Sequence, residues 1–70
     1  MRTILERVQE EESKLASKVT RLTDFIDNNS TFDTLDDVQR VLLVTQLNAM
    51  KMYLFIVQER LIDLNKKANN

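Results

Sequence analysis

The segment from Leu35 to Lys67 constrains the fold most, because it is almost continuously apolar and long enough for many helical turns. At about 100° per residue its apolar side chains gather on two faces. The first, here the 43–64 face, has the alternating spacing of helix-on-helix packing; it comprises Leu43, Leu47, Met50, Leu54, Val57, Leu61 and Leu64. The second, the 38–56 face, comprises Val38, Leu42, Thr45, Ala49, Met52 and Ile56. A helix with two apolar faces needs at least two neighbours.

The composition limits how such a helix can be stabilised. The chain has 70 residues and contains no cysteine, histidine, glycine or proline. Two helices of this size bury little surface and need a disulfide, a metal or a partner chain. Without cysteine and histidine the usual disulfide and zinc or iron sites are excluded, and association remains. The lack of glycine and proline is typical of a chain that is helical throughout.

Charge and hydropathy indicate the compartment and exclude some partners. The net charge is -1, whereas nucleic-acid binders are usually strongly basic on one face. The longest stretch without charge, between Arg40 and Lys51, is ten residues, about half of what a membrane span requires. The N-terminus lacks the apolar segment of a signal peptide. We therefore expect a soluble cytoplasmic protein that acts neither in membranes nor on nucleic acid.

The first half of the chain predicts a second, narrower helix over residues 3–28. Thr3 and Glu6 have the spacing of a capping box. The apolar residues form a single stripe, which consists of Leu5, Val8, Leu15, Val19, Leu22 and Ile26. Residues 29–34 interrupt the periodicity with side chains that favour turns, and Asn28 or Asn29 is expected to end the helix in a left-handed conformation. Thr34 is expected to cap the second helix, over residues 35–67.

These elements predict an all-α fold, an antiparallel two-helix hairpin that assembles into an oligomeric helical bundle. Residues 1–70 form its single domain. The second helix is the longer, so Leu61, Ile62 and Leu64 are expected to overhang the first. We predict a homo-oligomer whose interface is the 43–64 face, although the pattern leaves open which apolar face contacts the first helix. Val44, Phe55 and Ile62 lie on a third face and suggest a further contact.

Polar side chains recur every seven residues along the border between the two apolar faces. This row consists of Gln39, Gln46, Tyr53, Arg60 and Lys67. As a ligand groove, it offers Tyr53 to stack on a base, and Gln46 and Arg60 to bind phosphate or base edges; Arg40 and Lys51 complete the candidate ligand-binding set. Alternatively, the row only flanks a packed seam and keeps its polar tips in water, and we favour this structural interpretation.

The sequence offers little chemistry for catalysis. Without histidine there is no Glu-x-x-His pair for a di-iron bundle, and neither Glu-x-x-Glu nor Glu-x-x-Asp occurs. Without glycine there is no phosphate-binding loop of the usual type. Glu12 interrupts the first helix's stripe and is expected to accept a bond from Lys51 or Tyr53 that fixes the register. We expect no enzymatic activity, no catalytic residues, no cofactor and no metal.

One combination of residues along both helices resembles a known group of proteins. It consists of Arg7-Val8, Leu15, Lys18, Leu22, Phe25-Ile26, Phe32, Leu35, Leu42-Leu43, Gln46, Met50, Tyr53 and Arg60-Leu61. This order resembles small uncharacterised helical-hairpin proteins of tailed bacteriophages and prophages, including the crAss-like phages. The resemblance implies a viral protein made in a bacterial cell, where such proteins often block host defences. The expected function is counter-defence by sequestering a small nucleotide signal, such as a cyclic nucleotide or an ADP-ribose-type signal, or by masking a host defence protein. The alternative is a structural or regulatory adaptor of phage development.

Overall fold

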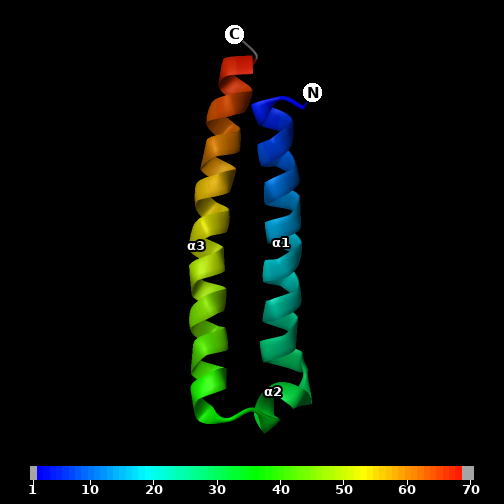
Figure 1. Cartoon of the computed structure of the whole chain (residues 1–70), viewed down its shortest axis with the longest axis vertical. Coiled ribbons are helices and arrows are strands. Elements are labelled where there is room, and N and C mark those ends of the chain that lie inside the picture. The colour runs from blue at the N-terminus through cyan, green and yellow to red at the C-terminus, as the bar shows by residue number, and fades with distance from the viewer. Residues whose placement is uncertain (1, 69–70) are drawn as a thin grey trace.

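Three helices make up the computed structural model, which describes residues 2–68. They are α1 (Ile4–Asn28), α2 (Ser30–Thr34) and α3 (Asp37–Ala68). The two long helices lie side by side and antiparallel, and short α2 closes one end (Figure 1). The molecule is a rod of 51 × 18 × 18 Å. The described residues contain no strand, so the predicted all-α class is confirmed.

The start of α1 matches its sequence signature. The Thr3 Oγ1 accepts a hydrogen bond from the Glu6 amide at 3.1 Å, and the Thr3 amide donates to Glu6 Oε1 at 3.1 Å. The predicted capping box is therefore confirmed. It satisfies two amides that would otherwise lack partners at the helix start.

The connection differs from the predicted turn because residues 30–34 form a helix of their own. Asn29 is extended, not left-handed, and its side chain accepts a bond from the Thr31 amide at 2.8 Å. Phe32 on α2 packs edge-on against Phe25 of α1, with ring centroids 6.1 Å apart. Helix α3 begins at Asp37, and the Asp36 carboxylate, rather than Thr34, accepts a bond from the Gln39 amide at 2.8 Å. The second long helix thus starts two residues later than predicted.

The core lies between α1 and α3 and uses the 43–64 face. The buried residues are Val8 and Leu15 of α1 with Leu47 and Val57 of α3. Other members of the face pack against them or are partly buried, namely Met50, Leu54, Leu61, Leu64 and Leu43. The predicted oligomer interface on the 43–64 face is therefore corrected, because this face is covered within the chain by the one apolar stripe of α1.

The predicted overhang is also wrong for Leu61 and Leu64, which both pack against the core. The hydrogen bond from Gln58 to Glu12 and the pair of Arg60 with Glu11 place the first half of α1 beside this part of α3. Ile62 remains half exposed because it points away from α1.

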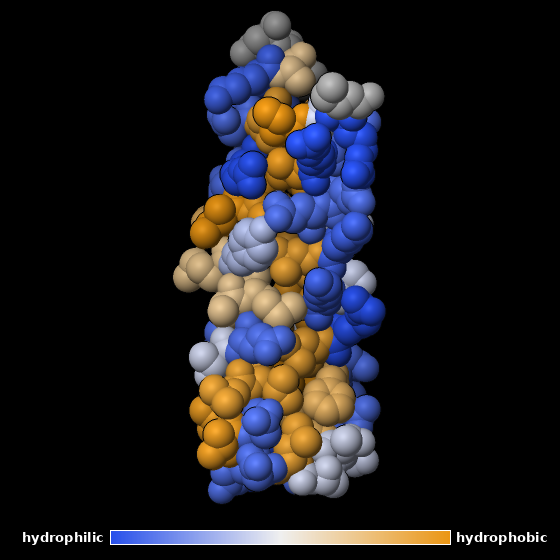
Figure 2. Space-filling model, viewed as in Figure 1, coloured by the Kyte–Doolittle hydropathy of each residue, from blue (hydrophilic) through white to orange (hydrophobic). Residues whose placement is uncertain are grey.

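The opposite side of α3 is apolar and uncovered. Exposed fractions on the 38–56 face are 66% for Val38, 54% for Leu42, 64% for Met52 and 50% for Ile56. Figure 2 shows apolar side chains exposed over α3, while polar side chains cover most of α1. By length and composition alone, α3 is apolar enough to cross a membrane. The exposed apolar surface of the described chain is thus concentrated on one helix.

Candidate functional site

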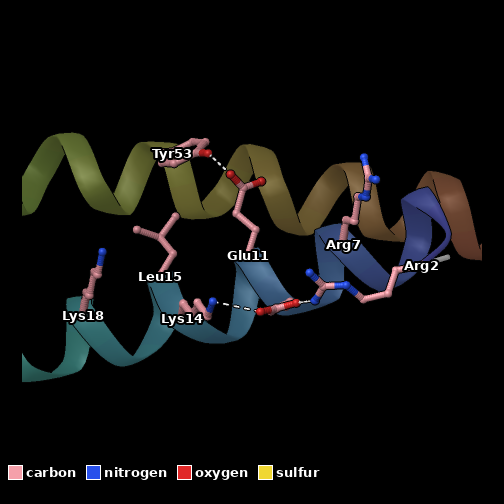
Figure 3. A pocket seen from close by; sticks show the side chains of 8 residues that line it. Arg2, Arg7, Glu11, Lys14, Leu15, Lys18 and Tyr53 are labelled. Atoms are coloured by element: carbon pink, nitrogen blue, oxygen red, sulfur yellow. Dashed lines mark hydrogen bonds and ion pairs between the residues drawn. The ribbon is translucent and has the colours of Figure 1, made fainter.

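The candidate site is a cleft between α1 and α3, centred on Glu11 and Tyr53. The Tyr53 hydroxyl donates a hydrogen bond to the Glu11 carboxylate (Figure 3). Arg60 lies two turns further along α3, with its Nη1 3.8 Å from Glu11 Oε1. One carboxylate of α1 thus joins two residues of the predicted polar row.

The residue that fixes this cross-helix contact is the neighbour of the predicted one. Glu12 was expected to accept a bond from Lys51 or Tyr53, but it lies 3.5 Å from the Gln58 side-chain amide, which donates to it. Glu11 takes the bond from Tyr53 instead. Glu11 and Glu12 are adjacent in the sequence and about 100° apart around α1, so the rotation of α1 about its own axis decides which of them faces Tyr53.

The cleft is open and has a volume of about 360 Å³, at the lower end of the range for small-molecule sites. Most of its walls come from α1, and Tyr53 is the contribution of α3. The lining residues are Arg2, Arg7, Glu10, Glu11, Lys14, Leu15, Lys18 and Tyr53. A second, adjoining hollow shares Arg7 and Glu11 and extends to Arg60. The two hollows together follow the α1–α3 boundary from Tyr53 to Arg60.

The cleft carries more positive than negative charge, with four cationic and two acidic side chains. Glu10 is neutralised by Arg2 and by Lys14, whose Nζ lies 2.8 Å away. Within residues 2–68, neither Arg7 nor Lys18 is in an ion pair. These two cations are therefore available to an anionic ligand.

Tyr53 supplies a flat apolar surface and a hydrogen-bond donor. Its side chain is 45% exposed and stands beside Leu15 in the cleft wall (Figure 3). The hydrogen bond to Glu11 raises the pKa of Tyr53 above its usual value, with smaller contributions from desolvation and from the Glu11 charge, and Arg60 opposes the shift. The phenol of Tyr53 therefore stays protonated to a higher pH than an ordinary tyrosine does.

The structure separates the remaining predicted ligand-binding residues from this cleft. The Gln46 side chain lies 3.8 Å from Met50 Sδ on the same helix. Arg40 pairs with Asp37 and lines a different, mostly apolar hollow near α2. Lys51 is exposed and points about 160° away from Tyr53 around the helix axis. Tyr53 and Arg60 are therefore brought together, whereas Arg40 and Lys51 lie on another side of α3.

The α1 half of the cleft was missed from the sequence. Arg7, Glu11, Lys14 and Lys18 are spaced four, three and four residues apart, which places them along one side of a helix. That charged row, beside the apolar stripe, was the available signal. Among residues 2–68, no group of acidic side chains is arranged to hold a metal ion. What the cleft does offer is binding chemistry: an aromatic face, hydrogen-bond donors and unpaired positive charge.

Comparison with known proteins identifies one family. The family model described as Sequestin matches residues 2–63, a range that includes every residue lining the cleft. The name is consistent with a binding protein that withholds a partner molecule. No curated protein matches the chain, and no solved structure matches it.

Proposed function

We propose that this chain, which belongs to the Sequestin family, is a non-enzymatic phage protein that sequesters a small nucleotide signal of bacterial defence. It would act in the cytoplasm of the host cell, as a homo-oligomer, by lowering the free concentration of the signal. The cleft between α1 and α3 is the proposed binding site, and its aromatic and cationic lining is the observation that carries the proposal.

The chemistry of the cleft favours a planar, anionic ligand. A nucleobase can stack on the exposed ring of Tyr53, a contact that is typically worth about 1–3 kcal/mol. Phosphate oxygens can pair with Arg7 and Lys18, which have no carboxylate partner within the described part of the chain, and with Arg60 at the other end of Glu11. Charge-assisted bonds of this kind are stronger than neutral ones. Cyclic nucleotides and ADP-ribose-type signals combine both features.

Sequestration requires binding without turnover, and the side chains of the cleft suit this role. Catalysis of phosphate or glycosidic cleavage needs a positioned general acid or base. Glu11 bonds Tyr53 and pairs with Arg60, and Glu10 is held by two cations. Both carboxylates of the lining are therefore already engaged in a hydrogen bond or in ion pairs within the chain.

One specific observation favours a second function. The exposed apolar face of α3 is also suited to a protein contact, as in an adaptor of phage development or a protein that masks a host defence factor. Such a protein would not depend on the cationic residues of the cleft.

The test is calorimetric titration of the protein with cyclic di- and trinucleotides and ADP-ribose-type signals. We expect at least one to bind, and Tyr53→Ala, Arg7→Ala and Arg60→Ala each to weaken it by tenfold or more, since a lost charged contact typically costs a few kcal/mol. Arg21→Ala, an exposed α1 residue outside the cleft, is the matched control and should bind normally. The ligand released after denaturation should be chemically intact. Absence of heat with every nucleotide would refute the proposal and leave the protein-masking function.

A further inference from the structure

The 38–56 face of α3 is apolar, exposed and regular. Its six residues are spaced alternately four and three apart, and the four large ones are at least half exposed. This is the same spacing that the 43–64 face uses to pack on α1. From this geometry we infer that a second copy of the chain packs on the 38–56 face, with its own α3 antiparallel, to give a four-helix bundle.

The exposed surface area of the chain supports an interface between two copies. A compact monomer of 8.2 kDa is expected to expose about 4,500 Å², whereas this chain exposes 5385 Å². The excess is about 850 Å², close to the roughly 800 Å² that each partner buries in a standard stable interface. A side-by-side dimer would therefore bring the rod to the surface area of an ordinary folded protein.

The arrangement of side chains on the face favours a second copy over an unrelated partner. A two-fold interface must be complementary to itself. In an antiparallel pairing centred between Thr45 and Ala49, Thr45 of each chain faces the partner's Ala49. Leu42 then meets the partner's Met52. At the ends, Val38 meets the partner's Ile56. Small residues thus coincide where the helices approach most closely, and large residues fill the space on either side.

A lipid surface fits this face less well. Helices that lie on membranes carry lysine and arginine along the border of their apolar face. Here the border is of mixed charge, because Arg60 and Lys67 of the polar row stand among Glu59 and Asp63 at one end of the face, and Asp37 stands at the other. The charged helix α1 also packs along α3 and would enter the lipid with any inserted α3.

The dimer also bears on the cleft. Around the axis of α3, Tyr53 lies between the exposed face and the core face. It is about 60° from Ile56 on the exposed face and about 40° from Val57 in the core. A second α3 on the 38–56 face would therefore form another wall beside Tyr53. This consequence rests on the proposed function, but the dimer itself does not, and its test contains no nucleotide.

Sedimentation equilibrium is the first test. The wild-type protein should have about twice the mass of one chain. Met52→Glu should raise the dissociation constant by about 100-fold or more, because it removes a central apolar contact and buries an unpaired charge. Met52 is outside the core, so circular dichroism should still show a helical protein. Ser17→Glu, the same charge added to the exposed side of α1, should leave the dimer intact.

The absence of cysteine allows a second test that does not depend on destabilising the fold. A mixture of Thr45→Cys and Ala49→Cys chains should form a disulfide-linked dimer on mild oxidation, whereas Thr45→Cys mixed with Ser13→Cys should not. A single-chain mass for the wild type, association that persists in Met52→Glu, or no cross-link would each overturn the proposal. So would flotation of the wild type with phosphatidylcholine–phosphatidylglycerol vesicles that Met52→Glu abolishes, since the face would then bind lipid.

Discussion

Val57 is the residue at which a single substitution should affect stability most clearly. Its side chain is 0% exposed, and among residues 2–68 it is the most deeply buried of the four core residues. Val57→Ala removes two carbon atoms from this core. At about 0.8 kcal/mol for each buried carbon, with a further ~1 kcal/mol for the cavity left behind, the free energy of unfolding should fall by about 2–3 kcal/mol.

That loss is large for a protein of this size. Small domains have about 0.05–0.15 kcal/mol of stability per residue, which for this chain is roughly 4–10 kcal/mol. Alanine is also the better helix former by up to about 0.7 kcal/mol, so the measured loss will slightly underestimate the packing contribution. The substitution should therefore remove between about a fifth and three quarters of the total stability.

Val44→Ala is the matched control, because it makes the same change in the same helix at a side chain that is 40% exposed. It should alter stability by less than about 0.5 kcal/mol, and any gain in helix propensity applies equally to both variants. The assay is urea unfolding followed by circular dichroism at one fixed protein concentration. Equal midpoints for the two variants would show that α1 does not pack on the 43–64 face.

The helices themselves were predictable because their signals are local. Thr3 and Glu6 identify the start of α1 through their own side-chain chemistry, and apolar periodicity without glycine or proline defines the two long helices. Helix α2 was missed because Asn29, like serine and threonine, favours both turns and helix caps. In the structure residues 30–34 are helical, and Phe32 of this short helix packs on Phe25 of α1. The local sequence of residues 29–34 does not predict this contact between helices.

The face of α3 that meets α1 could not be predicted for a related reason. The 38–56 and 43–64 faces have the same spacing, so periodicity cannot choose between them. The choice depends on how α2 orients the chain and on where α3 begins. Periodicity likewise cannot fix how α1 is rotated against α3, which is why Tyr53 bonds Glu11 whereas the predicted Glu12 meets Gln58.

Of the residues around the candidate cleft, the sequence predicted those of α3 and missed those of α1. Tyr53 and Arg60 were found because they break an otherwise apolar helix, where polar side chains stand out. Arg7 and Lys18 escaped notice because α1 is rich in charge, and a charged residue on a charged helix looks like ordinary surface. Only the register between the helices shows which of these cations border Tyr53.

Three further predictions test the caps and cross-helix bonds. Tyr53 is the sole tyrosine and there is no tryptophan, so the ultraviolet absorbance of the phenolate reports on one group; Glu11→Gln should lower its titration midpoint toward the ordinary pKa. Because the pKa of Tyr53 is raised in the folded state, its bond to Glu11 should stabilise the protein below pH about 10. This stabilisation should be lost as the pH rises through the raised pKa. A urea midpoint that stays constant at alkaline pH would contradict the assignment. Thr3→Ala should cost about 1 kcal/mol in urea unfolding by removing the cap, and an unchanged midpoint would mean that the first turn frays already. Arg60→Ala should leave the helical content intact and cost no more than about 1 kcal/mol, because its pair with Glu11 is long and exposed; a larger loss in urea unfolding would show that Arg60 supports the fold, and weak nucleotide binding by that variant would then say nothing about the cleft.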